Sequence, residues 1–312
     1  MDQATTLRTM VKVECDRTHH PKMDSEHRSS PLITRPKVIA VTSGKGGVGK
    51  TNVAANLAVA CQRLGKKVLI LDADLGLANI DIILGLNPKH NIGEVIRGEK
   101  ELSDIIITGP EGVAVMPASS GGQELAHLTE GQKANLLNEF DTLDSRFDIF
   151  LIDTGAGISS NVIYFNVAAQ ERLIVVTPEP TSITDAYALI KVLFQQHKTK
   201  SFLLLMNMVR DEKEAMSVYR NLSTVVARFM AGASIDYAGC IPWDRCLPES
   251  VSKREPVVCC YPESSSSKCF KRLAQHLLQQ NGSRPIDGNI KFFWKDLIAG
   301  KERDIDNEGT YQ

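Results

Sequence analysis

The chain has 312 residues, a formal net charge of −1, 23% charged residues and 43% hydrophobic residues. That length suits one large α/β domain with appendages or two small domains, and the composition is typical of a soluble protein. The near-neutral charge argues against a general nucleic-acid binder. No apolar run approaches the roughly 20 residues that a membrane-spanning helix needs.

The first 36 residues precede the first expected strand and fall into two parts. Ala4, Leu7 and Val11 would share one face of a short helix, with Arg8 beside it. Residues 18–36 are polar and contain several prolines, which is typical of a flexible linker. A short amphipathic helix on a tether is a form that docking peptides take, so residues 1–36 predict a partner-docking peptide and linker. The start of the chain lacks the basic and apolar regions of a secretory signal, and we expect a cytoplasmic protein.

Residues 38–51 predict a buried strand, a glycine-rich turn and the start of a helix, in that order. The segment from Gly44 to Thr51 fits G-x-x-x-x-G-K-[ST], the phosphate loop. Glycines let successive backbone N–H groups point inward as an anion nest, and the helix dipole adds positive potential. Lys50 is expected to reach the β- and γ-phosphates of a nucleotide, and the Thr51 hydroxyl to hold Mg²⁺. The alternative is a glycine-rich turn that binds nothing. The nucleotide-binding residues expected here are Gly44, Lys45, Gly46, Gly47, Val48, Gly49, Lys50, Thr51 and Asn52.

Two later strands end in acidic residues. The strand expected at residues 67–72 delivers Asp72 and Asp74 to the carboxyl end of the sheet, where ligands bind in open α/β folds. The strand expected at residues 147–153 ends in Asp153, and glycines follow it. That pattern is a Walker B and switch II signature, in which Asp153 binds Mg²⁺ through water and Gly155 offers its N–H near the γ-phosphate. For Asp72 and Asp74, a cap on the following turn is the alternative.

The remaining expected elements alternate between buried strands and amphipathic helices, which favours a doubly wound, mainly parallel α/β sheet with helices on both faces. They are helices at residues 52–64, 135–143, from about 180 to 196 and 269–280, and strands at residues 113–117, 173–178, 202–206 and 237–241. Residues 79–98 supply further core positions.

Lys45 is a second lysine near the start of the loop. A loop with this extra lysine is the deviant phosphate loop of the MinD/ParA group of ATPases, which are P-loop NTPases of the SIMIBI class. The chain resembles that group over about residues 37–282. The first residues resemble a branch of that group: they match D-Q-A-x-x-L-R, the pattern at the start of the flagellar-number regulators FlhG (FleN). The matching residues at this end are Asp2, Gln3, Ala4, Leu7 and Arg8. The alternative for Lys45 is a solvated surface lysine.

The resemblance implies roles for residues in the body. Lys45 would cross a dimer interface to the partner's nucleotide, as an arginine finger does. Asp74 would orient the attacking water, and Asp72 would support the Mg²⁺ shell. Asn207, at a strand end, and Pro242, with Asp244 as a weaker contact, would bind adenine; a turn former is the alternative for such strand-end residues.

The resemblance also implies the cofactors and partners. They are ATP and Mg²⁺, a homodimer when ATP is bound, and FlhF, a GTPase of the signal-recognition-particle type, bound through the N-terminal peptide. Flagellar switch proteins and a FleQ-type transcription activator are further implied partners. The family pattern weakens after residue 250, where the run from Ser264 to Ser267 does not fit, and this leaves contacts in that region open.

Residues 283–312 predict a linker and a C-terminal amphipathic helix. One face of that helix carries Ile290, Phe293, Trp294, Leu297 and Ile298, with lysines at its edge. An aromatic, basic-edged helix suits the plane of a membrane interface, so we expect reversible association with the inner face of the cell membrane. A helix docked on the protein body is the alternative.

Seven cysteines without a C-x-x-C pattern are expected to be reduced thiols. A metal site is the alternative for the four that fall in one stretch, Cys246, Cys259, Cys260 and Cys269. The function that the sequence predicts is an ATP-dependent dimerising switch for flagellar number and placement. The alternatives are a MinD-like division-site regulator, a ParA-like DNA-partition ATPase and an iron–sulfur carrier.

Overall fold

The structure is a computed structural model, and it describes residues 36–74, 79–117, 131, 139, 143 and 146–279. Its strands are β1 (Lys37–Ser43), β2 (Val68–Ala73), β3 (Ile107–Thr108), β4 (Ala114–Met116), β5 (Ile149–Ala156), β6 (Glu171–Val176), β7 (Ser201–Val209) and β8 (Ser234–Pro242). Its helices are α2 (Lys50–Arg63), α3 (Ile80–Ile83), α4 (Ile92–Ile96), α5 (Leu102–Ile105), the 3₁₀ helix η1 (Pro110–Gly112), α7 (Ser160–Ala168), α8 (Pro180–His197), α9 (Glu212–Phe229), α10 (Cys246–Ser252), α11 (Val257–Cys260) and α12 (Ser265–Gln279).

The strands form one eight-stranded sheet in the order β3-β4-β2-β5-β1-β6-β7-β8. Every neighbouring pair is parallel except β3 and β4, which are antiparallel. The chain leaves β1 toward β2 on one side and later adds β6 on the other, so the strand order reverses at β1. Ligands of open α/β sheets bind at such a point, outside the carboxyl ends of the strands. The predicted fold class is confirmed.

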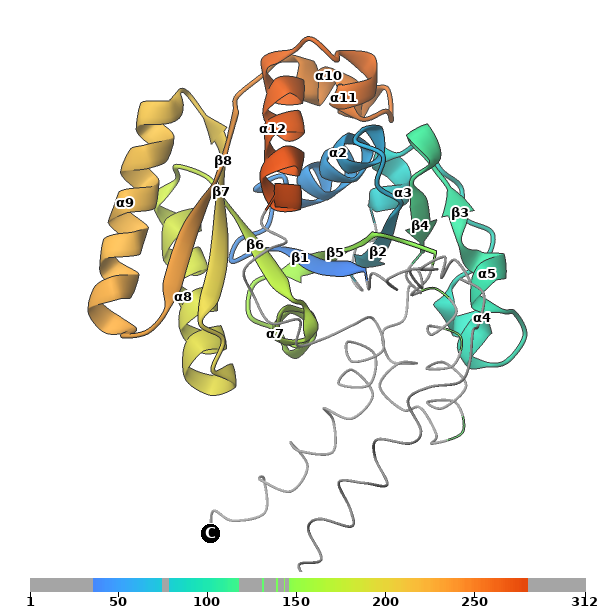
Figure 1. Cartoon of the computed structure of the whole chain (residues 1–312), viewed down its shortest axis with the longest axis horizontal. Coiled ribbons are helices and arrows are strands. Elements are labelled where there is room, and N and C mark those ends of the chain that lie inside the picture. Colours follow the sequence, from blue (N-terminus) through green and yellow to red (C-terminus); the bar gives the residue numbers. More distant parts are fainter. Residues whose placement is uncertain are drawn as a thin grey trace, which may run out of the picture. The chain divides into compact units, whose positions relative to one another are not determined.

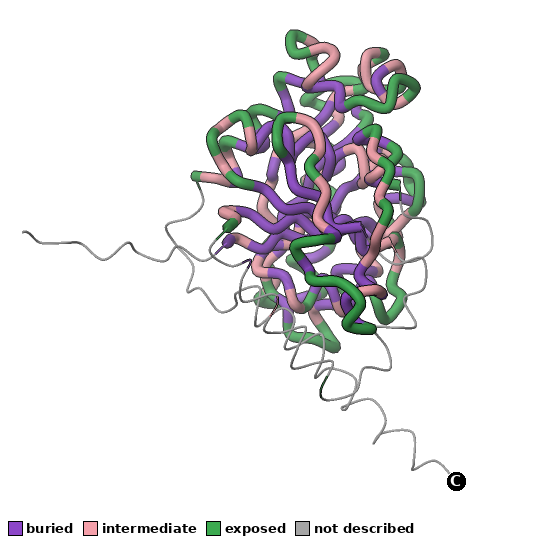
Figure 2. The backbone as a smooth tube through the Cα atoms, turned by 90° about the vertical axis from the view of Figure 1, so that its right-hand side faces the viewer, coloured by how far each residue is buried: buried purple, intermediate pink, exposed green. Residues whose placement is uncertain are grey.

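Alternating residues of β1 show how the sheet separates two helical layers. Ile39 and Val41 belong to the hydrophobic cluster that contains α2 and α12, whereas Val38 and Ala40 pack in a cluster with residues of α4, α5 and α7. A third cluster joins β6 and β7 to α7, α8 and α9. Figure 1 shows α2 and α12 above the strands and α7 below them, and Figure 2 shows the buried backbone running through the middle of the body. Such central strands are buried on both faces because helices cover both.

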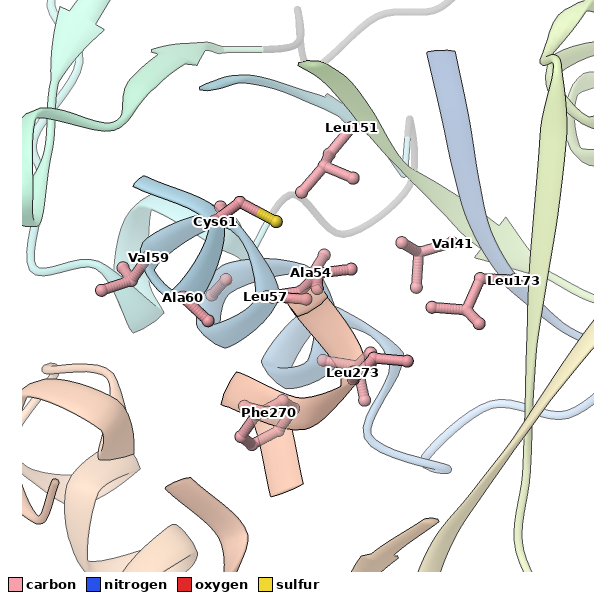
Figure 3. Close-up of a cluster of buried hydrophobic side chains, with 14 of the residues drawn as sticks. Val41, Ala54, Leu57, Val59, Ala60, Cys61, Leu151, Leu173, Phe270 and Leu273 are labelled. Carbon is pink, nitrogen blue, oxygen red and sulfur yellow. The ribbon is translucent and has the colours of Figure 1, made fainter. Parts of the chain in front are cut away.

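Helix α2 lies between the sheet and α12. Its Leu57 belongs to one hydrophobic cluster with Val41 of β1 and with Phe270 and Leu273 of α12, which Figure 3 draws, and all four side chains are at most 2% exposed. Fully burying one such side chain stabilises the fold by about 1.5–3 kcal/mol, so this contact fixes the helix that follows the phosphate loop. Burial also raises the pKa of the Cys61 thiol in this layer to about 12, which keeps it protonated and unreactive.

Helix α12 begins at Ser265, four residues before the start expected from the sequence. The Ser264 hydroxyl accepts the Ser267 N–H at 3.2 Å, and the Ser267 hydroxyl donates to Val257 and Tyr261 carbonyls. The serines that depart from the family pattern therefore start this helix, because serine oxygens satisfy the free N–H groups of a first turn.

Several predictions fall on residues outside the described ranges. The docking peptide with Asp2, Gln3, Ala4, Leu7 and Arg8 does so, as do the membrane-facing residues Ile290, Phe293, Trp294, Leu297 and Ile298, and most of the helix expected at 135–143. In the part of the chain that the structure describes, no helix has the length and apolar character to cross a membrane.

Candidate active site

The phosphate loop runs from the end of β1 into α2, as predicted. Gly47 and Gly49 have φ angles of 79° and 85°, which L side chains rarely adopt, and Gly49 is the N-cap residue of α2. A Cβ at Gly44 would lie 2.2 Å from the backbone carbonyl carbon of Asp185, so the loop packs directly on the backbone of α8. The Ser43 hydroxyl donates to the Lys45 carbonyl at 2.9 Å and holds the first turn. The loop thus has the curled backbone that an anion nest requires.

Lys50 and Asp153 form a buried ion pair at the base of the loop. Lys50 Nζ lies 2.9 Å from Asp153 Oδ1, and the two side chains are 8% and 1% exposed. Burial raises the pKa of Asp153, while the Lys50 charge acts against that rise. Asp153 Oδ2 is buried without a hydrogen-bond partner. A buried carboxylate oxygen without a partner is costly, and a hydrated cation would satisfy it, so the residues present fit Mg²⁺.

Asp72 holds the segment that follows β2 through hydrogen bonds to its backbone. It is 1% exposed and accepts backbone N–H groups from Asp74 at 3.1 Å, from Asn79 at 3.0 Å and from Ile80 at 3.1 Å. Burial and the charge of Asp153 raise its pKa to about 7. These hydrogen bonds agree with the alternative role, in which Asp72 caps the turn that follows β2. The other role, in which Asp72 supports the Mg²⁺ shell, stays a prediction. Because Asp72 faces Asp153 in register on the neighbouring strand, it lies beside the expected cation.

The end of β5 is tied to β1 at the same edge. Gly157 donates its N–H to the Ser43 carbonyl at 2.9 Å, and the Thr154 hydroxyl lies 3.0 Å from that of Thr42. Asp74 Oδ1 lies 3.8 Å from where a Cβ of Gly155 would be, so the expected water-orienting carboxylate faces the expected switch II glycine. The structure brings both to the carboxyl edge of the sheet beside Asp153.

Lys45 is held within its own chain. Its Nζ lies 2.5 Å from Glu179 Oε2 and 2.9 Å from the Thr181 hydroxyl. Glu179 is the N-cap residue of α8, which follows β6, and β6 is the neighbour of β1. The side chains of Lys45 and Glu179 are 35% and 60% exposed, so the pair can open into solvent. We call this contact the lysine latch. The sequence predicts residues 178–182 only as the start of a helix. The one sequence feature that indicates this contact is an acidic residue, Glu179, shortly after a strand that neighbours the phosphate-loop strand.

Asn207 joins the end of β7 to the phosphate loop. Its Nδ2 donates to the Val48 carbonyl at 2.8 Å, and its Oδ1 is buried without a hydrogen-bond partner. Pro242 lies opposite Val209 in the register of β7 and β8. The strand-end residues expected near a base therefore meet at one edge of the sheet.

The Asp244 side chain accepts hydrogen bonds from the start of α12. Its Oδ2 accepts from the backbone N–H of Ser266 at 2.9 Å and from the hydroxyls of Ser265 and Ser266, and its Oδ1 accepts from the Cys246 N–H. Partial burial would raise its pKa, but these hydrogen bonds outweigh it and hold the pKa well below the usual range. The carboxylate caps α12. The side chain of Asp244, for which we predicted a contact with adenine, is therefore already occupied by hydrogen bonds within the chain.

The cysteines are free thiols in the described ranges: Cys61, Cys240, Cys246, Cys259, Cys260 and Cys269. No group of three or more His, Cys, Asp or Glu side chains that could hold a metal occurs among the described residues. This does not conflict with Mg²⁺, because that ion is usually bound through waters, substrate phosphates and only one or two carboxylates.

Comparison with known proteins agrees with this geometry. Residues 35–278 match the family model described as ParA: NUBPL iron-transfer P-loop NTPase. The chain belongs to the ParA family of P-loop NTPases. The ParA-type body is 44% identical over 262 residues to the antiactivator FleN of Pseudomonas aeruginosa, covering 84% of this chain and 93% of that protein. It is 35% identical over 265 residues to the flagellum site-determining protein YlxH of Helicobacter pylori, covering 84% of this chain and 90% of the relative.

A solved structure of the same family has the same fold. The septum site-determining protein MinD of Pyrococcus horikoshii, in complex with Mg-ADP, is 26% identical and superposes with a TM-score of 0.64. The match covers 79% of this chain and 98% of the MinD chain. The resemblance to the MinD/ParA group that the sequence predicts is thereby confirmed. The roles of the individual site residues stay predictions that their positions support.

Proposed function

We propose that this chain is an ATP-hydrolysing, dimerising switch that regulates the number and placement of flagella. The observation that carries the proposal is the 44% identity with the antiactivator FleN over 93% of that relative. The phosphate loop of this chain also carries a second lysine, Lys45, near its start. The likeness to the flagellum site-determining protein YlxH supports the same biological role.

The proposed chemistry is phosphoryl transfer from ATP to water. The N–H groups of the phosphate loop bind the β- and γ-phosphate oxygens, and Lys50 turns from Asp153 toward them. Thr51 and Asp153 are the residues that would hold Mg²⁺, with Asp72 behind them. Mg²⁺ supplies neutralisation of the charge on the phosphates. Asp74 orients the attacking water, and Gly155 donates its N–H to the γ-phosphate. Fixed charges and dipoles do most of the catalysis.

The proposed switch is the exchange of partners by Lys45. In the single chain Lys45 is bound to Glu179 and Thr181. With ATP bound, two copies associate, and Lys45 of each contacts the γ-phosphate of the other. A γ-phosphate carries more negative charge than one carboxylate, so ATP favours the released lysine, whereas ADP lacks the group that competes with Glu179.

The proposed partners act through the two ends of the chain. Residues Asp2 to Arg8 bind FlhF, and the apolar face from Ile290 to Ile298 lies on the inner face of the cell membrane. Flagellar switch proteins and a FleQ-type activator are further partners in this proposal. A division-site regulator would share the ATPase body but would not need the N-terminal peptide.

Two experiments test the proposal. Deleting residues 1–10 should abolish stimulation of the FlhF GTPase while leaving ATP hydrolysis intact; unchanged stimulation would remove the flagellar assignment and favour the MinD-like alternative. For the membrane segment, co-sedimentation with anionic liposomes in ATP should be lost on Phe293→Glu. Binding that survives this change would contradict a membrane-facing helix.

A further inference from the structure

Helix α7 carries a buried polar side chain that the proposed chemistry does not use. Asn166 is fully buried, on the face of α7 that also buries Val162 and Ile163. Among the described residues its Oδ1 has no hydrogen-bond partner. A buried acceptor without a donor destabilises a fold, so packing alone would favour an apolar side chain here. Sequence choices that lower stability are expected where function requires them.

The Asn166 amide connects strands β1 and β5 to α7, which covers the face of the sheet opposite α2 (Figure 1). Its Nδ2 donates to the Thr42 hydroxyl at 3.0 Å and to the Val162 carbonyl at 2.8 Å. Since a carbonyl can only accept, the second bond fixes the orientation of the amide. The Thr154 hydroxyl can donate to that of Thr42 at 3.0 Å, and both threonines are fully buried. We call these three linked side chains the Asn166 network.

The Asn166 network ends at an irregularity of the sheet, directly before the expected switch II glycine. The register of β1 and β5 shifts between Val41 and Ser43. At this shift Thr42 of β1 lies opposite two residues of β5, Thr154 and Gly155. Thr154 Oγ1 also lies 2.8 Å from the Gly155 carbonyl oxygen and 3.2 Å from that of Val41. Such irregularities redirect side chains next to active sites. Because one planar peptide joins Thr154 to the Gly155 N–H, fixing Thr154 fixes the direction of that N–H.

We propose that Asn166 is a positioning residue for ATP hydrolysis, which acts through Thr42 and Thr154 to aim the Gly155 N–H at the γ-phosphate. This inference deepens the proposed function and rests on it. Gly155 is the group that contacts the nucleotide in that function, and a donor that is fixed in advance stabilises developing charge without reorganising during the reaction. ADP has no γ-phosphate, so the network contributes to ATP binding and hydrolysis but not to ADP binding.

The test compares Asn166→Leu with wild type in the full chain. Leucine is of similar size and removes the unsatisfied acceptor, so the melting temperature should stay or rise. Removing a donor that itself contacts the developing charge costs about 100–1,000-fold in kcat. Asn166 acts through two other side chains, so kcat for Mg-ATP should fall less in Asn166→Leu, about tenfold. The affinity for a non-hydrolysable ATP analogue should also fall, while the affinity for Mg-ADP stays unchanged.

Asn56→Leu is the matched control. Asn56 of α2 is equally buried, and its Nδ2 also donates to the carbonyl four residues earlier, at 2.8 Å. Its Oδ1, however, accepts the Val258 N–H at 3.2 Å, away from switch II. Asn56→Leu should lower the melting temperature because it leaves that N–H without an acceptor. The ratio of the affinities for the ATP analogue and ADP should not change.

Variants of Thr154 test the route of the effect. Thr154→Val should reproduce the loss of kcat, whereas Thr154→Ser, which keeps the hydroxyl, should retain most of the wild-type kcat. Combining Asn166→Leu with Thr154→Val should cost no more than either change alone, because groups of one hydrogen-bond network are not additive.

Three results would overturn the proposal. The first is a wild-type kcat in Asn166→Leu, and the second is an ADP affinity that falls as far as the affinity for the ATP analogue, which would mean general support of the site. The third is a double variant whose loss is the product of the two single losses, since Asn166 and Thr154 would then act independently. A wild-type chain that binds neither nucleotide would overturn the proposed function itself, and this inference with it.

Discussion

The contact between Gly44 and α8 allows a prediction from geometry alone. In Gly44→Ala the new Cβ would lie 2.2 Å from the carbonyl carbon of Asp185 and 2.5 Å from the backbone nitrogen of Ala186. Ordinary carbon contacts are about 3.5–4.0 Å, so loop and helix must separate by more than ~1 Å. The helix backbone cannot rotate aside as a side chain could. Overpacking of this kind costs about 1–3 kcal/mol, which corresponds to a melting temperature lower by ~2–12 °C for a domain of this class.

Gly46→Ala is the matched control. No atom lies within 4 Å of its new Cβ, so its stability should stay within about 0.5 kcal/mol of wild type. Thermal unfolding of the nucleotide-free proteins, followed by circular dichroism, measures both. Displacing the loop should also weaken the binding of Mg-ADP in Gly44→Ala, because its N–H groups would no longer point together at the phosphates. If Gly44→Ala and Gly46→Ala melt together, the packing of the phosphate loop on α8 is not as described.

Three further predictions follow from the charged groups of the site. Glu179→Gln should break the lysine latch. Each exposed ion pair stabilises by about 0.2–1 kcal/mol, and two such pairs break when a dimer forms. Sedimentation equilibrium with a non-hydrolysable ATP analogue should therefore show that the variant dimerises ~2–30-fold more tightly than wild type. The gain should shrink at about 1 M salt, where charges are screened, and an equal gain there would argue against an ion pair with Lys45. The pKa of Asp72 rises from 3.8 to about 7 on folding. Between these two pH values the native state therefore binds more protons than the unfolded state. Urea unfolding of the nucleotide-free protein should show a free energy of unfolding that falls as the pH rises from about 4 to about 7. Asp72→Asn should lose that slope, and a slope that persists would assign it to other groups. Asp244→Ala should lose about 0.5–2 kcal/mol at neutral pH, as caps do. Because folding depresses the pKa of Asp244 below 3.8, the difference from wild type should be full above pH 3.8 and shrink progressively as the pH falls below it, and a constant difference would contradict the cap.

The nucleotide edge of the sheet was predictable because its signals are local. A strand, the glycines from Gly44 to Gly49 and the start of α2 follow one another in the chain, and Asp72 and Asp153 each end a strand of continuous apolar residues. Parallel strands bring such ends to one edge. The sequence could therefore place Lys50 near Asp153 without knowing the distance between them.

Features that depend on tertiary contacts were not predicted. Helix α9 has apolar residues at helical spacing, Ala215, Val218, Leu222 and Val226, but they stand in a polar stretch and were not recognised as a core-facing stripe. The lysine latch joins residues 134 positions apart, and only the order of β1 and β6 brings them together. Met208 has a positive φ of 57° at a register shift between β7 and β8, for which a single sequence carries no signal.

The most direct test of the account is the mass of the protein in solution with different nucleotides. Sedimentation velocity of the 34.3 kDa chain with Mg-ADP should show a monomer, and a non-hydrolysable ATP analogue should shift the same sample to a dimer. Lys45→Ala should remain a monomer in both. A wild-type chain that stays monomeric while saturated with the analogue would contradict the proposal that Lys45 leaves Glu179 for the γ-phosphate of a second copy.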